Sequence, residues 1–377
     1  MSERILKYFF PAITIIVFAH CVKPYNPPAL QARNNYLVVD GFINTGANQV
    51  TVINLSRTRS LSDSTTATDP ELHASIVIAS DDGSIYSLTE TGNGAYQSAV
   101  LNLNNSKKYQ LKITTSNGST YSSEPVASQQ TPTIDSLTWQ QQNDVNIYLY
   151  THDPANNTHY YKWDYTETWQ YNSILQGAYV VIDNYIYVAD KTTQIDSCWQ
   201  TDSSATILTG TSISLSDDVI NHAKIATILQ NDDKIFVRYS MQVKQRAITQ
   251  EAYKYWQIVQ KNSQDRGGLF DLQPGQLVGN IHCETDPTEP VIGFINASSQ
   301  TTSRLFINHN QLTDWERGPT KCDTKTTPQN PVDFRIYSYP DPNYTAFFFS
   351  GSDVVIAQKL CVDCRTHGGT NQRPSYW

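Results

Sequence analysis

Charged residues, methionine and long apolar runs are all scarce in this sequence. Only 16% of its 377 residues are charged, and two are methionine. The net charge of −8 comes from 27 basic and 35 acidic side chains, so the usual electrostatic attraction to nucleic acid or anionic lipid is missing. After the N-terminal segment, no stretch is long and apolar enough for a membrane-spanning helix. We therefore expect a soluble body that binds no nucleic acid.

Sequence motifs of the common enzyme classes are also missing. The chain has no G-x-S-x-G, no H-E-x-x-H, no P-loop and no Rossmann glycine set. Glycoside hydrolysis needs two carboxylates ~5–10 Å apart, and the sequence singles out no such pair among its 35 acidic residues. We therefore predict a protein that is not an enzyme and has no cofactor and no metal. A secreted hydrolase is the least favoured alternative.

The features that are present begin with a secretory leader. Arg4 and Lys7 precede an apolar run over residues 8–19, and Cys21 follows it closely. The run is too short to span a bilayer as a helix, which takes about 20 residues. A basic segment, a short apolar segment and a cysteine at the cleavage position are typical of a lipoprotein signal peptide. We predict that residues 1–20 are removed and that Cys21 is acylated; a plain secretory signal cut nearby is the alternative.

The next two segments differ sharply in character. Residues 21–34 carry three prolines in five positions, which predicts an extended and fairly stiff tether. Between residues 35 and 130, β-type runs alternate with turn signals such as Asp82-Gly83 and Asn117-Gly118. Lys108–Ile113 alternates strictly, so its apolar side chains share one face. Strands spaced about 8–12 residues apart predict a seven-stranded, Ig-like β-sandwich over residues 35–130.

A larger β-rich region is expected over residues 131–377. Ile235–Arg246 alternates apolar and polar side chains and predicts the clearest strand of the chain. Thr249 is a predicted helix N-cap, and the apolar residues after it recur at i, i+3, i+4 and i+7. We therefore predict one amphipathic helix, at about residues 249–263, that covers an open face or edge of a sheet. The predicted fold class is mainly β.

One predicted strand is unusually rich in aromatic residues. Between residues 160 and 171 the odd positions are mostly Tyr or Trp, and the even positions are mainly polar. Because alternate side chains on a strand face opposite ways, the odd set either packs into the core or forms an exposed platform for a sugar, peptide or protein. The candidates for such a partner surface are Tyr161, Trp163, Tyr165 and Trp169.

Five cysteines follow Cys21, and they are Cys198, Cys283, Cys322, Cys361 and Cys364. The Cys361-x-x-Cys364 spacing is that of half a zinc site, but Cys283 and Cys322 are isolated rather than a second close pair. Disulfides are the default in the oxidising compartment that an exported protein meets. All five are therefore disulfide candidates, and two bridges with one free thiol satisfy the odd count. Zinc binding and free buried thiols are the alternatives, and the connectivity is open.

Several stretches together resemble one known family. They are Asp81–Gly83, Thr89–Gln97, Glu251–Trp256, Lys261-Asn262, Leu269–Pro274, Gly279-Asn280, Glu289–Gly293 and the ending Cys361–Trp377. They are similar to Bacteroidota lipoproteins grouped as domain of unknown function 4249, and the likeness covers essentially the whole mature chain. The resemblance implies an outer-membrane lipoprotein with no established catalytic activity, often encoded beside a TonB-dependent, SusC-like transporter.

The resemblance leaves the face of the outer membrane open. Surface-exported lipoproteins of this phylum often carry acidic residues just after the acylated cysteine, and residues 22–26 have none. The protein is therefore expected on the cell surface or on the periplasmic face. We expect a non-catalytic accessory or ligand-capture partner of a TonB-dependent transporter, whose ligand the sequence does not identify. A purely structural envelope-assembly lipoprotein is the alternative from a different functional class.

Overall fold

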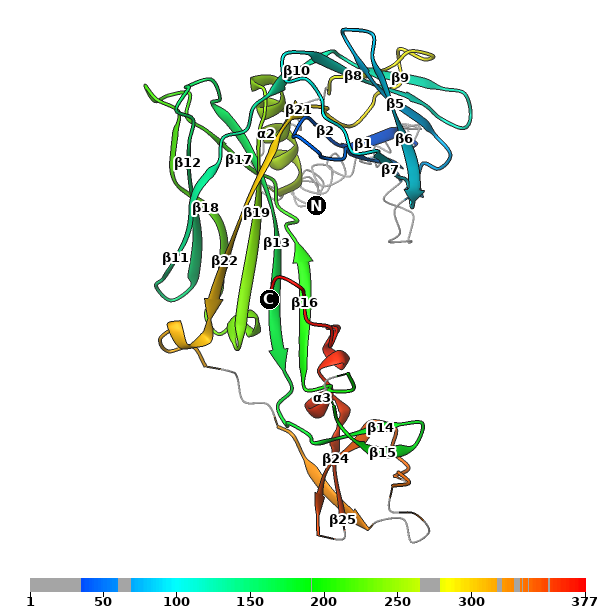
Figure 1. Cartoon of the computed structure of the whole chain (residues 1–377), viewed down its shortest axis with the longest axis vertical. Coiled ribbons are helices and arrows are strands. Elements are labelled where there is room, and N and C mark those ends of the chain that lie inside the picture. Colours follow the sequence, from blue (N-terminus) through cyan, green and yellow to red (C-terminus); the bar gives the residue numbers. More distant parts are fainter. Residues whose placement is uncertain are drawn as a thin grey trace, which may run out of the picture.

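The computed structural model describes residues 35–59, 69–190, 192–264, 279–316, 321–328, 333, 335–337, 339–351 and 353–377. Half of the chain is strand and 9% is helix, which confirms the mainly β class. The molecule is elongated, with an N-terminal sheet at one end, long strands in the middle and a small β subdomain at the other end (Figure 1). The leader, Cys21 and the tether lie outside the described residues.

Twelve short strands form the N-terminal sheet. They are β1 (Leu37–Gly41), β2 (Ile43–Asn44), β3 (Val52–Arg57), β4 (Asp69–Pro70), β5 (Ser75–Ser80), β6 (Ile85–Gly92), β7 (Ala95–Ser98), β8 (Lys108–Thr114), β9 (Thr120–Ser123), β10 (Val126–Gln129), β20 (Ile281–Cys283) and β21 (Ala297–Ser298). Its main path runs β1-β3-β7-β6-β5-β8-β10-β21-β2. Because β1 and β2 are consecutive along the chain, the two ends of this path lie close together. The sheet curves around buried side chains such as Leu37, Ile53 and Leu111.

The sequence placed this domain within residues 35–130, and the structure adds β20 and β21 from much later in the chain. The returning segment pairs with β1, where the amide of Val39 donates to the Ile292 carbonyl at 2.8 Å. Gly293 permits this close approach, because its φ is +148° and a Cβ there would lie 2.3 Å from the Val39 carbonyl oxygen. The buried Asn280 amide bonds both the N–H and the C=O of Ile295, at 2.8 Å each.

Two facing sheets form the middle of the molecule. One contains β11 (Ile134–Gln141), β12 (Val145–His152) and β18 (Val219–Ile228). The other contains β16 (Ser197–Ser203), β13 (Tyr160–Asn172), β19 (Arg238–Ala247) and β22 (Gln300–Asn308), with β17 (Leu208–Thr211) also on β13. Their apolar faces share one core, which includes Ile147, Trp163 and Val243. Two short 3-10 helices, η1 (Asp233–Ile235) and η2 (His309–Gln311), flank β19 and β22.

The predicted helix is α2 (Gln250–Gln264), and it packs between the N-terminal sheet and the middle sandwich. Ala252 and Tyr255 are buried on it, against Ile248 and Phe294. The helical spacing of the apolar residues places them on one face of α2, and this is the face that is buried.

The remaining strands form the distal subdomain. They are the hairpin β14 (Tyr179–Ile182) and β15 (Tyr185–Val188), and the sheet of β23 (Thr324–Pro328), β25 (Asp353–Gln358) and β24 (Tyr344–Ser350). Helices α3 (Lys359–Val362) and η3 (Cys364–His367) then lead back to the middle sheet. The region 131–377 therefore contains a sandwich and a separate distal core around Ile186, Tyr344 and Ile356.

A charged cluster joins the N-terminal sheet to the middle sandwich. The Asp164 carboxylate forms an ion pair with Lys162 Nζ at 2.6 Å and accepts a hydrogen bond from Arg246. Arg246 lies over the ring of Phe42, and Lys162 over that of Trp256, with cation-to-centroid distances of 4.3 and 4.8 Å. Burial alone would raise the pKa of Asp164, but the charges of Arg246 and Lys162 outweigh it and lower that pKa.

Asp164→Asn is expected to lower the free energy of unfolding at pH 7 by roughly 1–2 kcal/mol, because two cations lose their carboxylate. A carboxylate with a lowered folded-state pKa stabilises the protein above its ordinary pKa and loses that contribution as the pH falls through the lowered value. The difference from wild type should therefore shrink below about pH 4. Urea unfolding across pH measures it. The exposed Asp202→Asn on β16 is the control, and equal effects of both variants would contradict the assignment.

Candidate functional site

The five cysteines of the described ranges form two disulfides and leave one thiol free, which is the arrangement that satisfies their odd number. Cys198 bonds Cys364 and Cys322 bonds Cys361, while Cys283 is free and buried. The two cysteines of the C-x-x-C pair thus have different partners, so that pair does not act as half of a zinc site. Within the described ranges, no group of three or more His, Cys, Asp or Glu side chains is placed to hold a metal ion.

The aromatic strand β13 requires a correction. Its odd-numbered side chains face the middle core: Tyr161 is 0% exposed and Trp163 is 2% exposed. Tyr165 and Trp169 are half-buried against the same cluster. The indole N–H of Trp163 donates to Gln245 Oε1 at 2.8 Å, so its polar atom is satisfied inside the protein. The hypothesis that these four residues form an exposed partner surface is therefore wrong, because the sheet of β11, β12 and β18 covers them.

Two buried carboxylates lie in this sandwich, and both have partners. Asp218 accepts hydrogen bonds from the hydroxyls of Thr158, Tyr161 and Ser212. At the other end of the sandwich, the Glu167 carboxylate accepts hydrogen bonds from Lys234 Nζ at 2.6 Å and from the Tyr239 hydroxyl. Burial raises the pKa of Tyr161 and that of Tyr239, and the neighbouring carboxylates raise them further. Asp218 is 1% exposed and Glu167 7%, so these networks stabilise the fold and offer no substrate access.

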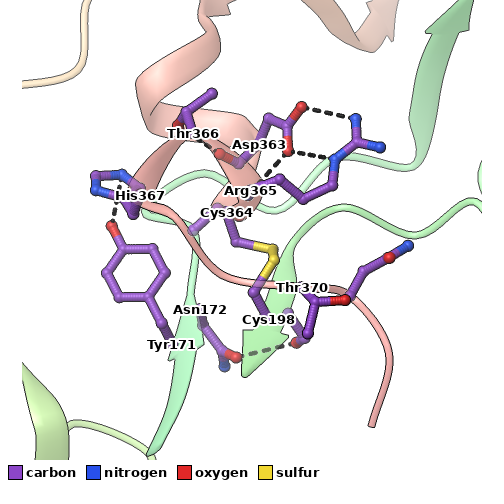
Figure 2. Close-up of a disulfide and its surroundings, with 12 residues drawn as sticks. Tyr171, Asn172, Cys198, Asp363, Cys364, Arg365, Thr366, His367 and Thr370 are labelled. Atoms are coloured by element: carbon purple, nitrogen blue, oxygen red, sulfur yellow. Dashed lines mark hydrogen bonds and ion pairs between the residues drawn. A yellow bond between two sulfur atoms is a disulfide. The ribbon is translucent and has the colours of Figure 1, made fainter. Parts of the chain in front are cut away.

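The C-terminal tail, residues 364–377, is attached to the edge of the middle sheet. Figure 2 shows Cys364 bonded to Cys198 of β16, with His367 beside Tyr171 of β13. The Tyr171 hydroxyl and His367 Nε2 are 3.0 Å apart. Trp199 and Thr370 then exchange two backbone hydrogen bonds of 2.8 and 3.0 Å. Glycine is required at position 369, where a Cβ would lie 2.9 Å from that of Cys198.

The last two residues of the tail lie on the polar face of the same sheet. The ring of Tyr376 stacks on the guanidinium of Arg304 at 3.7 Å, and its hydroxyl is 2.8 Å from that of Thr168. The indole N–H of Trp377 donates to Gln170 Oε1 at 3.3 Å. The Trp377 ring also meets that of Trp199 edge-on, at 6.4 Å between centroids. Thr168 and Gln170, two even-numbered residues of β13, are thus contacted by the chain's own tail.

A pocket of 630 Å³ lies where the tail meets β16. Its lining residues are Thr192, Gln194, Ser197, Trp199, Asn371, Gln372 and Arg373. The described lining combines one aromatic ring with amides and hydroxyls, and Arg373 is the only charged residue among these described members. With no carboxylate, imidazole or thiol in that lining, the pocket lacks a general acid–base pair and is suited to binding rather than to catalysis. It is the candidate functional site.

A larger pocket, of 1020 Å³, lies on the N-terminal sheet. The guanidinium of Arg57 lies at the bottom of this pocket, with Nε 2.6 Å from the Glu71 carboxylate and Nη1 3.5 Å from the Glu289 carboxylate. The Tyr121 hydroxyl donates to Glu289 at 3.0 Å. Burial would lower the pKa of Arg57, but hydrogen bonds to Glu71 and Tyr121 outweigh it and raise that pKa. These groups satisfy one another, so the base of this pocket is a structural ion-pair network.

Sequence reasoning missed the pocket at Trp199. Its two halves, around residue 199 and around residue 372, lie far apart in the sequence and are brought together by tertiary contacts, among them the Cys198–Cys364 bridge and the Trp199–Thr370 pairing. The Cys-x-x-Cys motif indicated disulfide bonds, but the local sequence pattern does not show which strand they link to. The hairpin β14–β15 did carry a signal, since Asp183-Asn184 is a turn pair and both residues have positive φ.

Replacing Cys198 and Cys364 together by alanine is expected to lower the free energy of unfolding by about 2–4 kcal/mol, because the bridge closes a long loop. The tail should then become sensitive to trypsin at Arg365 and Arg373. Urea unfolding and limited proteolysis with mass spectrometry measure both effects. Cys283→Ala removes a thiol without breaking a bridge and is the control. A double variant whose tail stays as protected as in that control would contradict a structural role for the bridge.

No curated protein matches this chain. Among solved structures, a DUF4785 family protein from Legionella pneumophila is 8% identical, with a TM-score of 0.17 and coverage of 55% of this chain and 52% of that one. The adhesin InvE of Yersinia pseudotuberculosis is 12% identical, with a TM-score of 0.15 and coverage of 57% and 55%. The chitinase ChiA74 from Bacillus thuringiensis is 16% identical, with a TM-score of 0.16 and coverage of 53% and 30%.

This chain spans about half the length of the first two of those structures. Likeness this low carries no argument about fold or activity. The family comparison is more informative, because one family model matches residues 22–304. That match begins directly after Cys21 and ends within β22, so it includes the N-terminal sheet, the helix and the strands of the middle sandwich except the last part of β22. The chain therefore belongs to the family described as Domain of unknown function (DUF4249).

Proposed function

We propose that this protein is a non-catalytic lipoprotein, anchored to the outer membrane through Cys21, that acts as an accessory or ligand-capture partner of a TonB-dependent transporter. The observation that carries the proposal is an exposed apolar surface at the distal end of the molecule. One face of the β14–β15 hairpin presents Ile182, Tyr185 and Tyr187, which are 40%, 42% and 51% exposed. We call these three residues the hairpin surface.

The position of the hairpin surface suits a tethered protein. The tether leads into β1, in the sheet at one end of the molecule, and the hairpin lies in the subdomain at the opposite end (Figure 1). The Cys322–Cys361 bridge and the packing of Tyr179 against Phe349, 4.7 Å between ring centroids, brace this subdomain. Exposed Tyr side chains on a rigid element are favoured contact residues for a protein partner. The hairpin surface is thus the contact proposed for the transporter.

Other features support a binding role over a catalytic one. The buried carboxylates Asp218 and Glu167 are closed off from solvent, and the pocket at Trp199 has no acid–base pair. Among the described residues no helix combines the length and the apolar character needed to cross a bilayer. Membrane attachment is therefore assigned in this proposal to the lipid on Cys21, since several acyl chains on one cysteine give a stable anchor.

Cys21→Ser is expected to release the protein from the membrane fraction, since acylation requires the thiol. Fractionation of cells that produce each form, with sequencing of the mature N-terminus, measures the effect. Cys283→Ser is the control, because Cys283 is buried in the N-terminal core. The anchor assignment fails if the Cys21 variant stays membrane-bound, or if the mature chain begins at another residue.

The double variant Ile182→Ser/Tyr187→Ser is expected to lower recovery of a TonB-dependent transporter by about tenfold or more in a pull-down from detergent-solubilised native membranes. Folding should be nearly unchanged, because both side chains are largely exposed. Ile85→Ser, at a residue 66% exposed on β6, is the matched control. Recovery of other envelope proteins without any transporter would contradict the proposal and favour the structural envelope-assembly alternative.

A further inference from the structure

We propose that the pocket beside Trp199 is a binding site for short neutral oligosaccharides. The inference goes beyond the proposed function, because it concerns a ligand bound in solution and needs neither membrane nor transporter. The volume of 630 Å³ falls within the roughly 300–1,000 Å³ of small-molecule sites. Two chain segments supply the walls: β16 with the loop before it, and the end of the tail.

The polar side chains of the pocket suit sugar hydroxyls. A hydroxyl both donates and accepts a hydrogen bond, and a side-chain amide offers one group of each kind. The amides of Gln194 and Gln372 line the pocket and make no hydrogen bond with any described residue. Asn371 uses only its NH₂ group, which donates to the Gln194 carbonyl at 3.1 Å, so its Oδ1 stays available as an acceptor. The pocket therefore offers several unused donors and acceptors.

Trp199 supplies the apolar part of such a site. One face of a pyranose ring presents mainly C–H groups, which pack on the flat surface of an indole, while its hydroxyls point outward to polar partners. The Trp199 side chain lines the pocket and is half-buried there. An aromatic surface surrounded by amides is thus the expected arrangement for a saccharide.

The described lining carries little charge, which suits a ligand held mainly by hydrogen bonds. Arg373 is the one charged side chain among the described lining residues, and one of its guanidinium nitrogens already donates to the Trp377 backbone oxygen at 2.5 Å. The other described lining groups are neutral amides, hydroxyls and one indole, which match the hydroxyls of a neutral ligand. A peptide strand is also disfavoured, because the backbone groups of Trp199 are paired with Thr370 and offer no free edge at this position.

The pocket is preorganised by covalent structure. Cys198 adjoins Trp199 and is bonded to Cys364, which fixes the tail against β16. Asn371 then ties the tail to the loop before β16 through its bond to Gln194. A site already held in shape loses less conformational freedom when a ligand binds, so modest polar contacts suffice for measurable affinity.

The test is titration of the detergent-solubilised mature protein with cellobiose, maltose, lactose and diacetylchitobiose, followed by tryptophan fluorescence and calorimetry. We expect saturable binding of at least one of them, in the millimolar range or tighter. Gln372→Ala should weaken that binding by roughly 2- to 10-fold, the effect of losing one hydrogen-bonding group. Trp199→Ala should abolish it and Trp199→Phe should weaken it less. Gln142→Ala, at an exposed glutamine remote from the pocket, should leave it unchanged.

The outcomes separate the candidate ligands. Binding of none of the four disaccharides, or equal binding by wild type and the Gln372→Ala variant, overturns the inference. Preference for digalacturonate over every neutral sugar also overturns it and assigns an acidic ligand through Arg373. Binding of a short peptide, with none of the disaccharides bound, also overturns the inference. Gln372 is exposed, so its variant decides the matter even if Trp199→Ala does not fold. A failed transporter pull-down leaves this result unaffected.

Discussion

The alternation of side chains along β13 is the constraint on which the rest of the structure depends. Its aromatic residues Tyr161, Trp163, Tyr165 and Trp169 pack into the core between the two middle sheets, and Tyr171 packs beside the Cys198–Cys364 bridge. Its even-numbered residues face the other way, where Asp164 binds Arg246 at the junction with the N-terminal sheet and Thr168 meets Tyr376 of the tail. One strand with alternating side chains therefore contributes to the core, to the contact between domains and to the surface on which the tail packs.

Covalent closure is the second organising feature. Cys361 and Cys364 lie three positions apart, yet they bond Cys322 and Cys198, so a short segment links the distal subdomain to the middle sheet. The Cys198–Cys364 bridge joins residues 166 positions apart in the sequence. It brings Trp199 and the tail amides together, and so the proposed saccharide site depends on a bond whose partners lie far apart along the chain.

Features set by local periodicity were predictable. The helix expected at about 249–263 is observed at Gln250–Gln264, because the spacing of Ala252, Tyr255, Trp256 and Val259 already places them on one helical face. The strand expected at Ile235–Arg246 is observed as β19, Arg238–Ala247, preceded by the single 3-10 turn η1. The strands β20 and β21 of the N-terminal sheet were not anticipated, since their pairing partners lie far away in sequence and no local pattern records that register.

The sequence by itself determined the mainly β class, the one amphipathic helix, and the fact that the aromatic residues of β13 share a face; two bridges with one free thiol were consistent with its odd number of cysteines, and the structure decided for them. Only the tertiary structure decided that this face is buried, because an alternating strand is equally consistent with either side being covered. The same holds for Trp199 and Gln372, which become neighbours across one pocket only after the disulfide and the strand pairing are formed. Local preferences act over a few residues, whereas a binding site depends on contacts between segments that only the folded chain brings together.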